Sequence, residues 1–231
     1  AQNIPTDPNI RIGTLPNGMK YYIKKNVKPE KKVELRLAIN TGSIMEDEDQ
    51  RGLAHFMEHM NFNGTKNFPD NKLVDFLQSI GVKFGQHLNA YTSFDETVYM
   101  LPVPLDKPGN LDSGLKVIED WAFNALLTDK EIDKERGVVL EELRLGLGPD
   151  KRMRDQYFPK IFYKSKYADR LPIGDKKLLE TFTYDKIRRF HKDWYRPDLM
   201  SVIVIGDINV DEMEAKIKKN FSSYKNPTLL S

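Results

Sequence analysis

The chain has 231 residues, a length that suits one large domain or two small ones, and we expect one. Its 36 basic and 34 acidic residues leave a formal net charge of +2, which gives no field that would attract nucleic acid or an anionic membrane. The sequence holds no cysteine, which excludes disulfides, thiolate zinc sites and cysteine nucleophiles.

Residues 1–10 are a loose segment with several Asn and Pro residues, and we expect this segment to be flexible. A start at Ala1-Gln2 suits a mature end left after a signal peptide is removed, so we expect a periplasmic or otherwise exported protein. No apolar run approaches the roughly 18 residues that a membrane span requires, so no transmembrane segment is expected.

The first elements are expected to be strands. Residues 11–14 and 19–24 flank the turn sequence Pro16-Asn17-Gly18, which is typical of a β-hairpin. Residues 33–39 alternate apolar with polar side chains, which predicts a strand with one face in the core and the other in water.

The next stretch contains the sequence His55-Phe-Met-Glu58-His59. On a helix, residues three and four positions apart share a face, with Cβ atoms roughly 5–6 Å apart, so both imidazoles and the carboxylate point the same way. Two neutral imidazoles can bind one Zn²⁺, and a carboxylate beside them can accept a proton from water. The order His-x-x-Glu-His is the inverzincin signature, so this stretch predicts a zinc site with Glu58 as general base.

The alternative is that two core histidines and a surface glutamate share a helix without a common function. Three matched residues on one face, flanked by apolar Leu53, Phe56 and Met57, favour the metal site.

The following elements are expected as a helix from about Asp70 to Ile80, strands over 82–91 and 97–103, and helices over 111–127 and 130–147. Further helices precede a strand over 200–205 and a closing helix over 210–221. The connector between the strands 82–91 and 97–103 is too short for a parallel crossover. These elements predict an α+β fold, a largely antiparallel sheet backed by helices on one face, over residues 11–222. Residues 223–231 have the composition of a linker.

A catalytic zinc needs a third protein ligand, and the helix over 130–147 offers candidates. Glu135 and Glu142 lie seven residues apart and share a face, whereas Glu141 is turned by about 100°. We choose Glu142 as the ligand, with Glu135 and Glu141 as rivals and Glu119 as a more distant candidate. Glutamates on a charged helix are ordinarily solvent-facing, which is the competing interpretation.

Four segments together resemble the pitrilysin family of zinc metallopeptidases, which includes insulin-degrading enzyme and mitochondrial processing peptidase. The segments are 55–65, 88–99, 135–142 and 190–207. The resemblance covers nearly the whole chain and implies an N-terminal catalytic domain with the fold of mitochondrial processing peptidase.

The resemblance also implies a role for each matching residue. His55, His59 and Glu142 match the zinc ligands, Glu58 matches the base that activates water, and Glu135 matches a second carboxylate that supports the site.

Four more residues match positions that bind substrate in this family. Asn89 and Ala90 match edge-strand positions that hold the peptide backbone, and Phe62 and Tyr91 match apolar positions beside the cleaved bond. Without the resemblance, Asn89 is typical of a turn and Tyr91 of ordinary strand packing.

We therefore expect a zinc-dependent endopeptidase that cleaves extended peptides or unfolded proteins. The resemblance implies a second homologous domain, supplied by the same polypeptide or by a partner subunit in a homodimer or heterodimer. The alternative is a non-cleaving peptide-binding or structural subunit. Such a subunit is expected to have lost metal-binding residues, and here all four residues of the site are present, which favours an enzyme.

Overall fold

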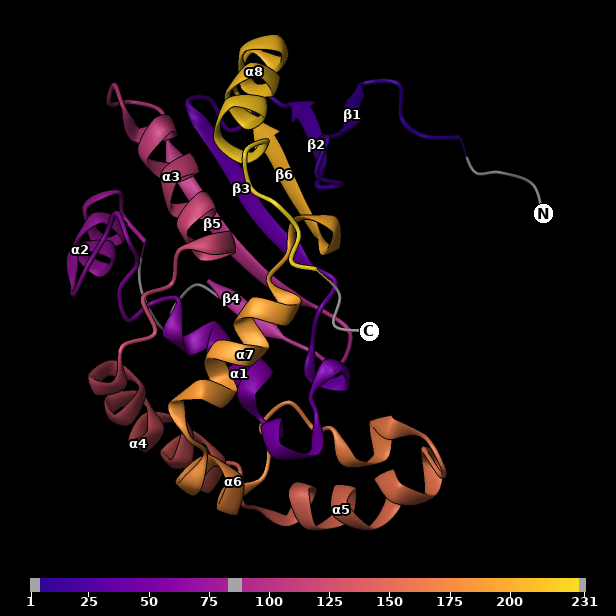
Figure 1. Cartoon of the computed structure of the whole chain (residues 1–231). Coiled ribbons are helices and arrows are strands. Elements are labelled where there is room, and N and C mark those ends of the chain that lie inside the picture. Colours follow the sequence, from indigo (N-terminus) through magenta and orange to yellow (C-terminus); the bar gives the residue numbers. More distant parts are fainter. Residues whose placement is uncertain (1–4, 83–88, 229–231) are drawn as a thin grey trace.

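The computed structural model describes residues 5–82 and 89–228 (Figure 1). In these residues the strands form one sheet with the order β1-β2-β6-β3-β5-β4. Strands β2 and β6 are parallel, and every other neighbouring pair is antiparallel. The predicted α+β fold with a largely antiparallel sheet is confirmed. The strands are β1 Ile10–Thr14, β2 Lys20–Lys25, β3 Lys32–Ile39, β4 Ala90–Thr92, β5 Thr97–Pro104 and β6 Met200–Gly206.

The helices follow the predicted order and cover one face and one end of the sheet (Figure 1). None of the helices in the described ranges is long and apolar enough to cross a membrane. The helices are α1 Leu53–Met60, α2 Lys72–Ser79, α3 Asn110–Phe123, α4 Asp129–Leu145, α5 Pro149–Ile161, α6 Lys176–Thr181, α7 Tyr184–Trp194 and α8 Val210–Phe221.

Most boundaries lie within two residues of the expected ones, and three differences have a visible cause or fall near the residues outside the described ranges. Helix α3 ends at Phe123 rather than at 127, because Ala125 leaves the helix and forms a β-bridge with Thr65. Helix α2 begins at Lys72, after Asp70 takes a left-handed φ of 55°. Of the strand expected over 82–91, residues 83–88 lie outside the described part, Val82 is not in a strand, and β4 begins at Ala90.

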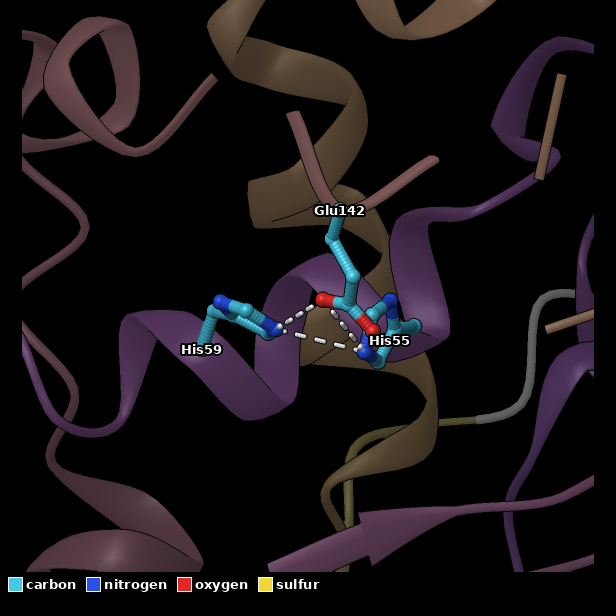
Figure 2. Close-up of side chains that lie close together, drawn as sticks. All are labelled: His55, His59 and Glu142. Atoms are coloured by element: carbon cyan, nitrogen blue, oxygen red, sulfur yellow. Dashed lines mark hydrogen bonds and ion pairs between the residues drawn. The ribbon is translucent and has the colours of Figure 1, made fainter. Parts of the chain in front are cut away.

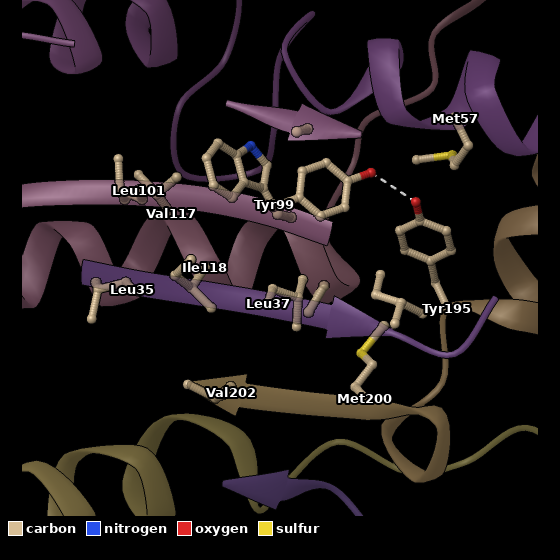
Figure 3. Close-up of a cluster of buried hydrophobic side chains, with 14 of the residues drawn as sticks. Leu35, Leu37, Met57, Tyr99, Leu101, Val117, Ile118, Tyr195, Met200 and Val202 are labelled. Atoms are coloured by element: carbon tan, nitrogen blue, oxygen red, sulfur yellow. Dashed lines mark hydrogen bonds between the residues drawn. The ribbon is translucent and has the colours of Figure 1, made fainter. Parts of the chain in front are cut away.

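The core lies on one face of the sheet (Figure 3). Along β3 the apolar residues Leu35 and Leu37 are fully buried, while Glu34 and Arg36 point to the other, wetter face. Helix α3 packs closely on the apolar face, because a Cβ atom at Gly114 would lie only 2.9 Å from the side chain of Val103. The alternation in the sequence therefore predicted this face correctly.

Helix α1 lies at the end of the sheet and contacts β4, α4 and α7. Its apolar residues Phe56, Met57 and Met60 are buried in the core, so the remaining face of the helix is turned toward β4 and α4. Gly52 caps the helix with a φ of 99°. The carboxylate of the buried Glu46 accepts a hydrogen bond of 2.9 Å from the amide of Ala54 in the first turn.

Candidate metal centre

The two motif histidines face each other on α1. Their rings are nearly perpendicular, with centroids 4.6 Å apart, and the Nε2 atoms are 3.2 Å apart (Figure 2). The helical spacing of four residues therefore brings the two nitrogens together, as the sequence predicted.

Glu142 reaches the same point from helix α4 (Figure 2). Its Oε2 lies 3.3 Å from Nε2 of His59 and 3.7 Å from Nε2 of His55. One donor atom from each of the three residues lies within 4.8 Å of the others, and no other group of this kind is found in the described ranges.

The spacing of these atoms suits zinc. Four ligands at the corners of a tetrahedron, with zinc–nitrogen bonds of about 2.0–2.1 Å, lie about 3.3 Å from one another. The measured separations of 3.2, 3.3 and 3.7 Å are close to that value, so three of the four corners can be occupied with little movement of the side chains. Two imidazoles and one carboxylate also form a ligand set that zinc uses in catalytic sites.

Glu135 binds the far side of His59. Its Oε1 lies 2.8 Å from Nδ1 of His59, and its Oε2 accepts a 2.7 Å hydrogen bond from the side-chain amide of Asn63. A carboxylate at Nδ1 holds the proton there and leaves Nε2 free to bind a metal ion. Asn63, which the sequence analysis missed, in turn fixes the carboxylate.

The surroundings shift the pKa values of His55, Glu58, His59 and Glu142. Burial lowers the pKa of His55 to about 4. Burial also acts to lower the pKa of His59, but the hydrogen bonds with Glu135 and Glu142 outweigh it and raise that pKa to about 9. The hydrogen bond with His59 lowers the pKa of Glu142, and burial raises that of Glu58. Binding of a metal ion through Nε2 of His59 would compete with protonation of that nitrogen.

Glu58 lies beside this centre and lines a pocket of about 420 Å³. The pocket is bounded by α1, by strand β4 and by the loop that leads into α6. Pro172 and Ile173 of that loop were not predicted. Their signal in the sequence was the Leu171-Pro-Ile-Gly174 turn, which packs against the start of α1. The lining residues are His55, Glu58, His59, Ala90, Tyr91, Thr92, Glu142, Pro172 and Ile173.

Of the four predicted substrate-binding residues, Ala90 and Tyr91 line this pocket, whereas Phe62 and Asn89 do not. The ring of Phe62 packs against Trp121 and Tyr99, with centroids 5.3 and 6.3 Å away, and Phe62 is not among the residues that line the pocket. Asn89 precedes β4 and accepts a backbone hydrogen bond from the amide of Met100. Tyr91 is 36% exposed and donates a hydrogen bond to Glu96.

Two rival ligands lie away from the histidines. Glu141 is exposed and pairs with Arg144 at 2.7 Å, whereas Glu119 accepts hydrogen bonds from Lys116 and Tyr224. Of the four candidate acids, the structure places Glu142 and Glu135 at the histidines.

The chain is similar to known proteins over most of its length. The family described as Insulinase (Peptidase family M16) matches residues 21–156, and the family described as Peptidase M16 inactive domain matches residues 181–230. The probable zinc protease PqqL of Haemophilus influenzae is 41% identical over 97% of this chain and 24% of its own length. The protein of the same name from Escherichia coli is 39% identical over 96% of this chain and 24% of its own length.

Comparison with solved structures finds the same relative. The first half of the periplasmic protease PqqL from Escherichia coli superposes with a TM-score of 0.91 and 38% identity, over 99% of this chain and 49% of that one. By contrast, the chain spans about a quarter of the length of the two full-length PqqL proteins named above.

Proposed function

The chain belongs to the insulinase family of peptidases, M16, and we propose that it is the metal-binding catalytic domain of a zinc-dependent endopeptidase. The proposed domain covers residues 11–222, between an N-terminal segment over residues 1–10 and a linker-like end over 223–231. Its substrates would be extended peptides or unfolded proteins. The observation that supports this proposal most directly is the convergence of His55, His59 and Glu142 from two helices, beside Glu58 and an open pocket.

In this proposal His55, His59 and Glu142 hold Zn²⁺, and Glu135 orients His59 through Nδ1. The ion, when bound, supplies a Lewis acid that polarises the scissile carbonyl and makes water a stronger acid. Glu58 accepts the proton of the attacking water and later delivers it to the leaving amine. Because burial raises the pKa of Glu58, its carboxylate is a stronger base than a solvated glutamate would be.

Strand β4 is the proposed binding site for the peptide backbone. Within the described residues it pairs with β5 on one side only, so its other edge keeps free amide and carbonyl groups. An extended peptide can add to such an edge as a further strand. Ala90 and Tyr91 would then bring the peptide alongside the metal centre, because both residues line the same pocket.

Replacement of Glu58 by Gln tests the catalytic assignment. We expect Glu58→Gln to retain zinc, because the ligands are intact, and to lower kcat by roughly 10²- to 10⁴-fold, because the base is lost. His59→Ala should lose zinc. The readouts are metal analysis and cleavage of a quenched fluorescent peptide, with the exposed Glu141→Gln as the control. Cleavage by Glu58→Gln at the wild-type rate would show that Glu58 is not the base.

We further propose that a second domain completes the enzyme. Helix α5 has no buried residue in this chain, and exposed apolar side chains continue from the end of α4 along α5. They are Leu145, Leu147, Met153, Tyr157 and Ile161. The relatives are longer than this chain, which supports the remainder of a longer polypeptide as the group that covers this surface.

We also propose that the protein is exported, because one structural relative is described as a periplasmic protease.

Peptidase assays of this chain alone and of the longer polypeptide would test the need for a second domain. Zinc binding without cleavage in either form would instead support the non-cleaving, peptide-binding role.

A further inference from the structure

The proposed base is held by a residue of the proposed substrate strand. The hydroxyl of Thr92 in β4 donates a 2.5 Å hydrogen bond to Oε2 of Glu58 in α1. In the described part of the chain, this is the one hydrogen bond that the Glu58 carboxylate makes. The bond joins two elements whose residues are 34 positions apart in the sequence.

The hydrogen bond divides the two oxygens of the carboxylate between two tasks. Oε2 is occupied by the hydroxyl, which leaves Oε1 to accept a proton. A base transfers a proton efficiently only from within about 2.6–3.2 Å of the group that carries it. A glutamate side chain without a partner loses that geometry for part of the time, because several torsions are free to rotate.

Thr92 is itself fixed by the sheet. It pairs with Thr97 of β5 in register, is half-buried and lines the pocket together with Ala90 and Tyr91. The same three-residue strand carries the free edge on which the peptide is proposed to bind. Any peptide that orders β4 therefore also orders the hydroxyl that holds the base.

We propose that Thr92 is a positioning residue, which holds the Glu58 carboxylate in its reactive orientation and couples it to the strand that binds the substrate. This inference rests on the proposed function, because it assigns Thr92 to the same reaction. Thr92 does not touch the reacting atoms and acts through Glu58.

Two substitutions separate the hydroxyl from the shape of the side chain. Thr92→Val keeps the branched shape and removes the donor, whereas Thr92→Ser keeps the donor. In the full-length, zinc-loaded protein we expect Thr92→Val to lower kcat by roughly 10- to 100-fold, since misplacement of a reacting group by about 1 Å costs about 10²-fold. KM should change by less than about twofold and the zinc content should not change, because Thr92→Val keeps the backbone groups of β4 and all three metal ligands. Thr92→Ser should restore kcat.

A double-mutant cycle with Glu58→Gln provides the control. If Thr92 acts through Glu58, Thr92→Val should have no further effect on the residual rate of Glu58→Gln. An equal loss in both backgrounds, a loss confined to KM, or a Thr92→Ser protein as slow as Thr92→Val would overturn the proposal.

A crystal structure of Thr92→Val gives a readout that does not depend on turnover. We expect the Glu58 carboxylate to rotate away from its wild-type position or to occupy several positions. If the wild-type enzyme cleaves no peptide, the proposed function fails, and the position of Glu58 still decides the role of Thr92. An unchanged Glu58 carboxylate in Thr92→Val would refute the positioning role.

Discussion

At the scale of single residues, two glutamates of helix α4 differ in what they can do for the metal centre. Glu135 is 7% exposed and contacts Nδ1 of His59, whereas Glu141 is exposed and pairs with Arg144. We expect Glu135→Gln to weaken zinc binding by roughly 10- to 100-fold, because the amide no longer attracts the proton on Nδ1. Zinc titration against a competing chelator measures the effect.

The matched control for this prediction is Glu141→Gln, which removes the same charge from the same helix. Its zinc affinity should equal that of the wild type. Equal losses in the two variants would mean that the net charge of α4, rather than the contact with His59, governs affinity.

The buried Glu46 makes the stability of the protein depend on pH. Burial raises the pKa of Glu46 from 4.5 to about 8, although the amides of Ala54 and Gly52 and the charge of Arg170 oppose the shift. The folded protein therefore binds this proton more tightly than the unfolded chain does. This stabilisation is complete below pH 4.5 and is lost as the pH rises through about 8.

Replacement of Glu46 by Gln should remove this dependence, because a neutral amide can accept the same hydrogen bond at every pH. We expect the free energy of unfolding of the wild type to fall relative to Glu46→Gln between pH 4.5 and 8, by up to about 5 kcal/mol. Urea unfolding at several pH values measures the difference. Parallel pH profiles for the two proteins would contradict the prediction.

The sequence predicted those site residues that a local rule relates to one another. His55, Glu58 and His59 share a face because of helical spacing, and Glu142 was chosen because two histidines need a third ligand. Which of the acids reaches the histidines depends on how α4 packs against α1, and no local pattern contains that information. For the same reason Thr92 was not predicted as a partner of Glu58.

At the scale of elements, two glycines fix where helix α1 begins. Gly52 and Gly174 both have left-handed φ angles, and a Cβ atom at Gly174 would lie 2.4 Å from the Cα atom of Gly52. This close contact holds the loop that carries Pro172 and Ile173 against helix α1. Pro172 and Ile173 can therefore line the pocket only because residues 52 and 174 are both glycines.

Gly174→Ala should destabilise the protein more than Gly109→Ala does. Gly109 has a similar φ of 87° but no atom within 4 Å of an added Cβ, so it isolates the cost of the backbone angle. We expect Gly174→Ala to cost about 2 kcal/mol more, because the added atom must push two backbone segments apart. Thermal and urea denaturation measure the difference, and equal costs would show that the contact is easily relieved.

Elements with a strong periodic pattern were predicted well and their ends less well. The closing helix was expected over 210–221 and is observed as α8, Val210–Phe221. Helix α3 ends early because Ala125 pairs with Thr65, a residue 60 positions earlier in the chain. Such a long-range bridge outweighs the helical pattern of Leu111 to Leu127, and it cannot be seen in a local window.

At the scale of the whole molecule, the last strand lies in the middle of the sheet. Strand β6 pairs with β2 on one side and with β3 on the other, and it buries Met200, Val202 and Val204. The sequence predicted the strand but not its position between two strands from the first part of the chain. The one parallel pair in the sheet results from this insertion.

A chain that ends at residue 198 should therefore fail to fold, because it lacks β6 and helix α8. We expect loss of the near-ultraviolet circular dichroism signal and of cooperative unfolding, whereas a chain that ends at residue 228 keeps both. Cooperative unfolding of the shorter chain would show that the two parts of the sheet are stable without β6.

The central position of β6 also determines when folding can finish during synthesis. Until residues 200–206 have left the ribosome, the nascent polypeptide carries two partial sheets, β1-β2 and β3-β5-β4, whose inner edges have no partner. Such open edges readily pair with other chains, so the growing polypeptide is prone to aggregation until β6 has been synthesised and inserted.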